Sequence, residues 1–144
     1  MNAGVIKTTL ASLGAACLVQ FFLHQIQSDF IFNFLKSNIT NLQVALLAVN
    51  TATLGIVLTK IRELIDKTGQ RAAFESTRNE MLLSIKEQVT LVASSLLIIA
   101  IEAAKNFPIE IPSDVFQATL IASFIYSIFV LYDTAKSVFV ILDY

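Results

Sequence analysis

Long runs of apolar residues alternate with short polar and charged stretches along this chain. Residues 8–23, 42–58 and 89–101 contain no charged side chain, and a further apolar run follows Asp114. A helix that crosses the hydrocarbon core of a bilayer needs about 20 mostly apolar residues. The pattern therefore predicts an all-α membrane protein with four transmembrane helices in a single domain. We place these spans at about residues 5–24, 41–60, 87–106 and 115–132.

The segment after the first span has a different pattern. Ile26, Phe30 and Phe34 recur at every fourth residue. This spacing favours an amphipathic helix that lies in the membrane interface, or an extension of the first span beyond the membrane.

Residues 61–86, between the second and third spans, are expected to form a helical hairpin extension. Gly69 is expected to end its first helix, because glycine adopts the left-handed conformation that follows many helix ends. Thr77 and Glu80 have the spacing of a capping box, which predicts that the second helix begins there.

Basic residues predict the orientation, because cytoplasmic loops of membrane proteins collect Lys and Arg. If both termini and the hairpin are cytoplasmic, Lys7 and Lys136 join the hairpin's basic residues, and only Lys36 and Lys105 lie outside. We therefore expect an integral protein, most simply of a bacterial inner membrane, with a cytoplasmic hairpin. Six of the ten basic residues lie between the uncharged runs 42–58 and 89–101: Lys60, Arg62, Lys67, Arg71, Arg78 and Lys86.

Composition narrows the function classes. The chain is 56% hydrophobic with a mean hydropathy of +0.72, and its net charge of −1 argues against a nucleic-acid partner. One His and one Cys cannot supply a zinc site built from several such ligands. The sequence shows no nucleophile–base pair and no glycine-rich phosphate loop. We expect no cofactor, no metal and no enzymatic activity.

Small residues form rows on two of the predicted spans. Such rows let two helix backbones approach closely in lipid, so they predict packing within the bundle or between copies in a homo-oligomer. Val57 lies nearly opposite the row on the second span. That row comprises Ala45, Ala48, Ala52 and Gly55, and the fourth span carries the pairs Ala118 with Ala122 and Ser123 with Ser127.

Among the polar residues within the spans, we single out Gln20, Asn50, Ser95 and Glu102. Gln88, Ser95 and Glu102 are spaced by seven and should share a helix face. Such residues either tie helices together or line a path for ions or a substrate. Glu102 likewise has a structural and a functional interpretation. It pairs with Lys105 near the membrane surface, or it titrates in a proton-coupled transporter.

The hairpin is the candidate surface for a cytosolic partner. Its basic residues are nearly balanced by acidic ones, and mixed charge suits a protein better than an anionic lipid surface. The alternative is a hairpin that is only solvated. The candidate partner-binding residues are Arg62, Lys67, Arg71, Arg78 and Lys86.

The layout of the chain resembles small four-span membrane subunits of bacterial phage-defence systems of the Kiwa type. The resemblance implies a compact bundle whose inner surface holds a soluble effector. The sequence therefore favours a non-enzymatic membrane subunit that oligomerises and acts as a sensor or scaffold for a cytosolic effector. The alternative is a small ion channel or a proton-coupled transporter that uses Glu102.

Overall fold

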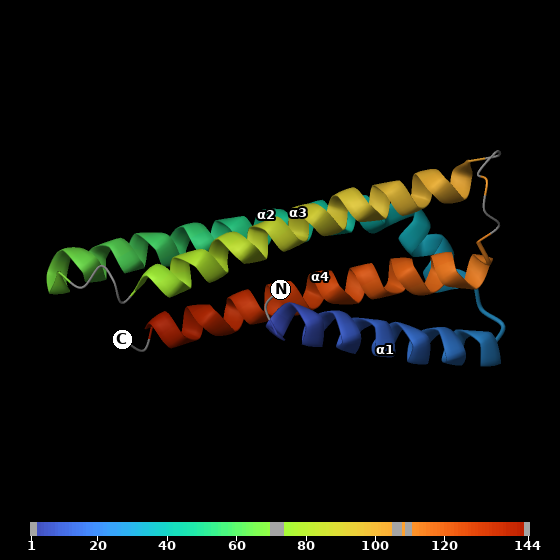
Figure 1. The fold of residues 1–144 in the computed structure, drawn as a ribbon, viewed down its shortest axis with the longest axis horizontal. Coiled ribbons are helices and arrows are strands. Elements are labelled where there is room, and N and C mark those ends of the chain that lie inside the picture. The colour runs from blue at the N-terminus through green and yellow to red at the C-terminus, as the bar shows by residue number, and fades with distance from the viewer. Residues whose placement is uncertain (1–2, 70–73, 105–107, 109–110, 143–144) are drawn as a thin grey trace.

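The computed structural model describes residues 3–69, 74–104, 108 and 111–142, and the described chain is all-α. Its four helices are each long and apolar enough to cross a membrane, as the sequence predicts. They are α1 (Ala3–Gln25), α2 (Phe30–Thr68), α3 (Glu75–Ala103) and α4 (Ser113–Leu142) (Figure 1).

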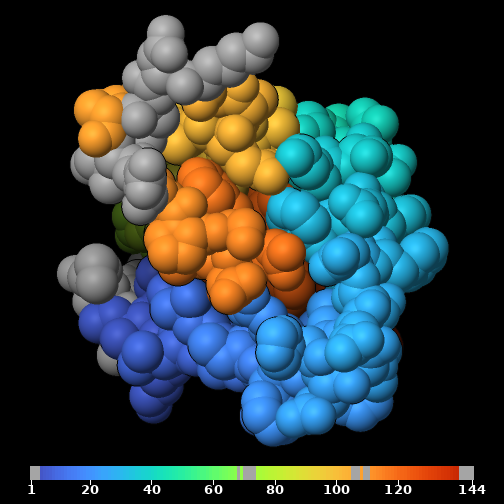
Figure 2. Space-filling model, turned by 90° about the vertical axis from the view of Figure 1, so that its right-hand side faces the viewer, coloured from blue at the N-terminus to red at the C-terminus, as the bar shows by residue number. Residues whose placement is uncertain are grey.

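The fourth helix is the centre of the bundle. It contacts α1, α2 and α3, whereas α1 packs mainly on α4. Figure 2 shows this arrangement end-on, with α4 between the other three helices. We call the end at which α2 leads into α3 the hairpin end, and the end that carries the other two connections the loop end.

The interior of the bundle holds several polar side chains beside its apolar core, and many large apolar side chains lie on its surface. Gln43, Asn50, Gln88 and Ser95 are at most 2% exposed, whereas side chains such as Phe21 are 66% exposed. A water-soluble bundle would bury its apolar side chains first. An apolar surface with polar groups paired inside fits apolar surroundings, in which lipid solvates the surface and the polar groups bond to one another.

Helix α2 runs unbroken from Phe30 to Thr68, which corrects one expectation from the sequence. The Phe-rich segment is neither a separate interfacial helix nor an extension of the first span, because a turn at residues 26–29 joins α1 to α2. With 39 residues, α2 is about 58 Å long, roughly twice the ~30 Å hydrocarbon core. In Figure 1, α2, α3 and α4 accordingly continue past the start of α1.

Glycine 69 ends α2 as predicted. Its φ of 69° is left-handed, and its N–H donates to the carbonyl oxygen of Ile65 at 2.8 Å. The predicted start of the next helix is wrong: Phe74 precedes the first turn of α3, so Thr77 and Glu80 already lie within the helix. Side chains from both helices then pack together at the hairpin end, in a cluster of Leu54, Val57, Ile61 and Met81.

Candidate functional site

A layer of buried polar side chains joins α2, α3 and α4 near the middle of the bundle. The Gln43 amide nitrogen donates to the Ser123 and Ser127 hydroxyls at 2.9 and 3.2 Å. The Ser95 and Ser123 hydroxyls are hydrogen-bonded at 2.8 Å. Ser95, Ser123 and Ser127 were predicted from the sequence and meet here. Gln43 was missed, although a Gln inside an uncharged run was itself a signal.

A second polar layer lies closer to the hairpin end. The Asn50 amide nitrogen donates to the Ser84 hydroxyl at 2.9 Å and to the Gln88 side-chain oxygen at 3.0 Å. The Ser84 and Thr134 hydroxyls are hydrogen-bonded at 3.0 Å, which extends the layer to α4. Asn50 therefore has the partners on another helix that a polar group needs in lipid.

These layers leave some hydrogen-bonding capacity unused. In the part of the chain that the structure describes, Gln43 Oε1, Asn50 Oδ1 and Gln88 Nε2 are buried without a partner. An unpaired polar atom in an apolar interior costs about 1–3 kcal/mol. Two of these atoms are acceptors, Gln43 Oε1 and Asn50 Oδ1, and the third, Gln88 Nε2, is a donor.

The two remaining polar residues of the predicted set lie outside this interior. Gln20 ties α1 to α4, because its amide nitrogen donates to the Asp114 carbonyl oxygen at 2.8 Å. Glu102 forms an ion pair across the loop end with Lys36 of α2, at 2.7 Å. Lys105, the partner considered from the sequence, lies outside the described residues. Lys36 also lies over the Phe32 ring, 5.7 Å from its centroid.

The row of small residues on α2 does not pack inside this bundle. Ala45, Ala48, Ala52 and Gly55 are exposed, and an added Cβ at Gly55 would meet nothing within 4 Å. The opposite face of α2 is buried instead, with Val57 only 3% exposed.

The pairs on α4 lie on the inner side of their helix. Ala122, Ser123 and Ser127 are buried and Ala118 is half-buried. They let the central helix approach its neighbours, so their packing partners belong to the same chain.

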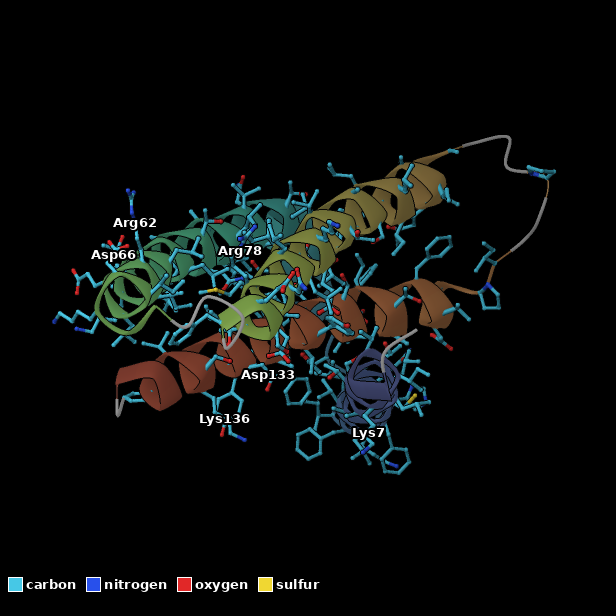
Figure 3. The ribbon with its side chains drawn as sticks, turned by 60° about the vertical axis from the view of Figure 1, so that its left-hand side comes forward. Lys7, Arg62, Asp66, Arg78, Asp133 and Lys136 are labelled. Atoms are coloured by element: carbon cyan, nitrogen blue, oxygen red, sulfur yellow. The ribbon has the colours of Figure 1, made fainter. Side chains whose placement is uncertain are left out.

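A cavity of about 400 Å³ lies between α1, α3 and α4. The carboxylates of Glu80, Glu87 and Asp133 line it together with Lys136 and the Ser84 and Thr134 hydroxyls, and we call it the acidic cavity. Through these hydroxyls the cavity adjoins the Asn50 layer. Figure 3 shows Asp133 and Lys136 on α4 in the half of the molecule that also carries Arg62, Asp66 and Arg78.

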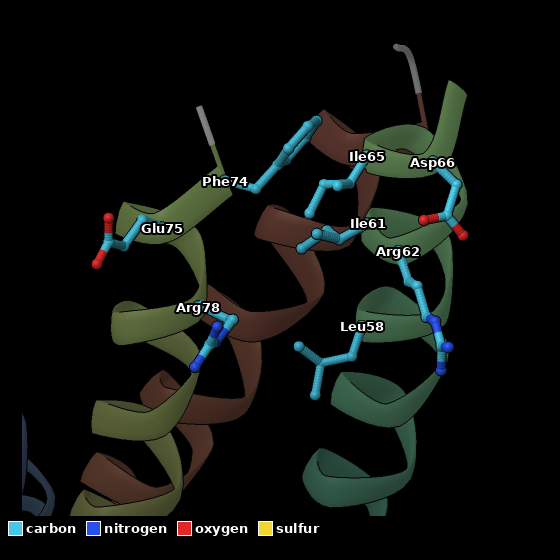
Figure 4. Close-up of a pocket in the computed structure, with 8 residues that line it drawn as sticks. All are labelled: Leu58, Ile61, Arg62, Ile65, Asp66, Phe74, Glu75 and Arg78. Carbon is cyan, nitrogen blue, oxygen red and sulfur yellow. The ribbon is translucent and has the colours of Figure 1, made fainter. Parts of the chain in front are cut away.

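A larger cavity, of about 850 Å³, separates α2 from α3 at the hairpin end, and we call it the hairpin groove. Four apolar side chains point into it, and four charged side chains flank it (Figure 4). The apolar residues are Leu58, Ile61, Ile65 and Phe74, and the charged residues are Arg62, Asp66, Glu75 and Arg78.

The hairpin groove contains two of the predicted partner-binding residues, Arg62 and Arg78. Lys67 and Lys86 are exposed on α2 and α3 but do not line the groove. Arg71 lies outside the described residues.

The described side chains and the comparisons with known proteins assign no metal site and no family. Within residues 3–69, 74–104 and 111–142, no group of three or more His, Cys, Asp or Glu side chains is placed to hold a metal ion. Comparison of the chain with protein-family models, curated proteins and solved structures finds no match.

Proposed function

We propose that this protein is a non-enzymatic integral membrane subunit that presents its hairpin end to a cytosolic protein. The hairpin groove is the observation that supports this function best. Its apolar lining consists of Leu58, which is 42% exposed, the half-buried Ile65 and Phe74, and the buried Ile61, and charged side chains flank it. Exposed apolar surface rimmed by polar residues is typical of protein-binding sites.

The distribution of charge supports a cytoplasmic hairpin end. Lys60, Arg62, Lys67, Arg78 and Lys86 all lie on the hairpin half of α2 and α3, and Lys36 lies at the loop end. Short loops rich in Lys and Arg stay on the cytoplasmic side. A bacterial inner membrane with both termini in the cytoplasm agrees with this bias.

Self-association is the second part of the proposal. The exposed row from Ala45 to Gly55 has no neighbour within the described bundle, so a second copy has room to approach it. Together with the resemblance in layout to Kiwa-type subunits, this favours an oligomeric sensor or scaffold in phage defence.

Site-specific cross-linking tests the partner proposal in intact cells. Phe74, in the hairpin groove, is replaced by the photoreactive residue p-benzoylphenylalanine, and Phe34, 46% exposed at the loop end, is the matched control. We expect the probe at position 74 to capture a cytosolic protein and the probe at position 34 to capture none. Identical adducts from both positions, or none at position 74, would contradict the proposal.

The unpaired amide atoms of the polar layers favour a second candidate, a small channel or transporter. Gln43, Asn50 and Gln88 would then line a hydrated path that passes the acidic cavity and ends at Glu102. If so, Glu102→Gln should abolish flux or shift its pH dependence in reconstituted vesicles. Unchanged flux would remove this candidate.

A further inference from the structure

The flanks of the hairpin groove carry their charges in a fixed order. On α2, Asp66 lies one turn closer to the tip of the hairpin than Arg62. On α3, Glu75 lies almost one turn closer to the tip than Arg78. Because the two helices are antiparallel, both flanks have a carboxylate near the tip of the hairpin and a guanidinium nearer the apolar spans (Figure 4). The groove is therefore bordered by an acidic level at the tip and a basic level behind it.

These four charges form no ion pair within residues 3–69, 74–104 and 111–142. The ion pairs among the described residues are Lys36–Glu102 and Lys60–Glu63, and neither pair includes any of the four. Within α2, the basic residue precedes the acidic one, which is the weaker order for a pair four residues apart. All four side chains are exposed and remain available to a partner.

We propose that the groove binds one amphipathic helix of a protein partner, with a charge order complementary to its flanks. This inference rests on the proposed function and names the chemistry of the partner. Apolar side chains of the helix would contact Leu58, Ile65 and Phe74. Carboxylates of the helix would pair with Arg62 on one flank or Arg78 on the other, and basic side chains one turn away would pair with Asp66 or Glu75 on the same flanks.

An anionic lipid headgroup suits this groove less well. Its phosphate would pair with Arg62 and Arg78 but would meet the carboxylates of Asp66 and Glu75 one turn away. A helix carries both signs at the required spacing, because residues three or four apart lie on the same face. Charge complementarity of this kind selects partners more than it adds affinity.

Binding of defined peptides to the full chain in neutral-lipid nanodiscs tests the inference. Three synthetic helical peptides share one apolar face and carry, beside it, an acid and a base four residues apart, two acids, or two bases. We expect the acid–base peptide to bind at least about tenfold more tightly than either of the others in fluorescence anisotropy. The double variant Arg62→Glu with Arg78→Glu should instead prefer the all-basic peptide.

Two further variants keep this test interpretable. Arg78→Glu alone is a milder change at an exposed side chain, and it should shift the preference in the same direction. Lys7→Glu reverses an exposed charge on α1 and should leave the ranking unchanged.

Three outcomes overturn the inference. Equal affinity for the three peptides would show that the charge order does not select the partner, while a cross-link from position 74 would still support the proposed function. If none of the peptides binds, the groove does not bind a helix. If anionic lipid stabilises the wild type but not the double variant, and no peptide binds, the groove belongs to a headgroup.

Discussion

Asn50 is the residue on which the interior depends most. It is 0% exposed and joins α2 to α3 directly, and to α4 through Ser84 and Thr134. Its neighbour Thr51 is also polar but is exposed and donates only to the Leu47 carbonyl of its own helix. Two adjacent polar residues of one span therefore have different roles.

We predict that Asn50→Ala destabilises the bundle by about 1–2 kcal/mol, because it leaves Ser84 and Gln88 without their shared donor. Thr51→Ala should change stability by no more than about 0.5 kcal/mol, since it removes no contact between helices. Thermal unfolding in detergent measures both. Equal melting temperatures for the two variants would show that the Asn50 hydrogen bonds do not hold the helices together.

Some features of helix α2 were predictable from the sequence and others were not. Its apolar length and its end at Gly69 were predictable, because an uncharged run and a helix-ending glycine are local signals. Its buried face was not, because lipid is as apolar as Leu and hydrophobicity does not separate the Val57 face from the Ala48 face. Likewise, the ion pair of Glu102 with Lys36 joins residues 66 apart, which spacing within one helix cannot reveal.

Substitutions on the two faces of α2 should have opposite effects. Ala48→Leu and Ala52→Leu change exposed positions, so the fold should persist while oligomers dissociate. Val57→Ala leaves a cavity in the buried cluster and should cost about 1–3 kcal/mol of fold stability with assembly intact. Thermal unfolding and size-exclusion chromatography separate the two effects. If Ala48→Leu and Ala52→Leu both assemble as the wild type does, the Ala48 face of α2 contacts lipid only.

At the scale of the whole molecule, the two ends differ in charge and in shape. At the loop end, Lys36 and Glu102 form an ion pair. The hairpin end carries α2 and α3 beyond the start of α1 and holds both the groove and the acidic cavity (Figure 1). The four-helix composition was predictable from apolar runs, but these two cavities were not, because each needs side chains from separate helices.

The orientation of these ends decides whether a cytosolic partner can reach the groove, and cysteine labelling tests it. In a Cys17→Ser background, Ser37→Cys and Ser113→Cys place exposed thiols at the loop end, and Ser76→Cys places one at the hairpin end. We expect an impermeant thiol reagent to label positions 37 and 113 in intact cells, and position 76 only after the membrane is opened. The reason is the excess of Lys and Arg at the hairpin end. Labelling of position 76 in intact cells would reverse the orientation, and a cytosolic partner for the hairpin groove would then be impossible.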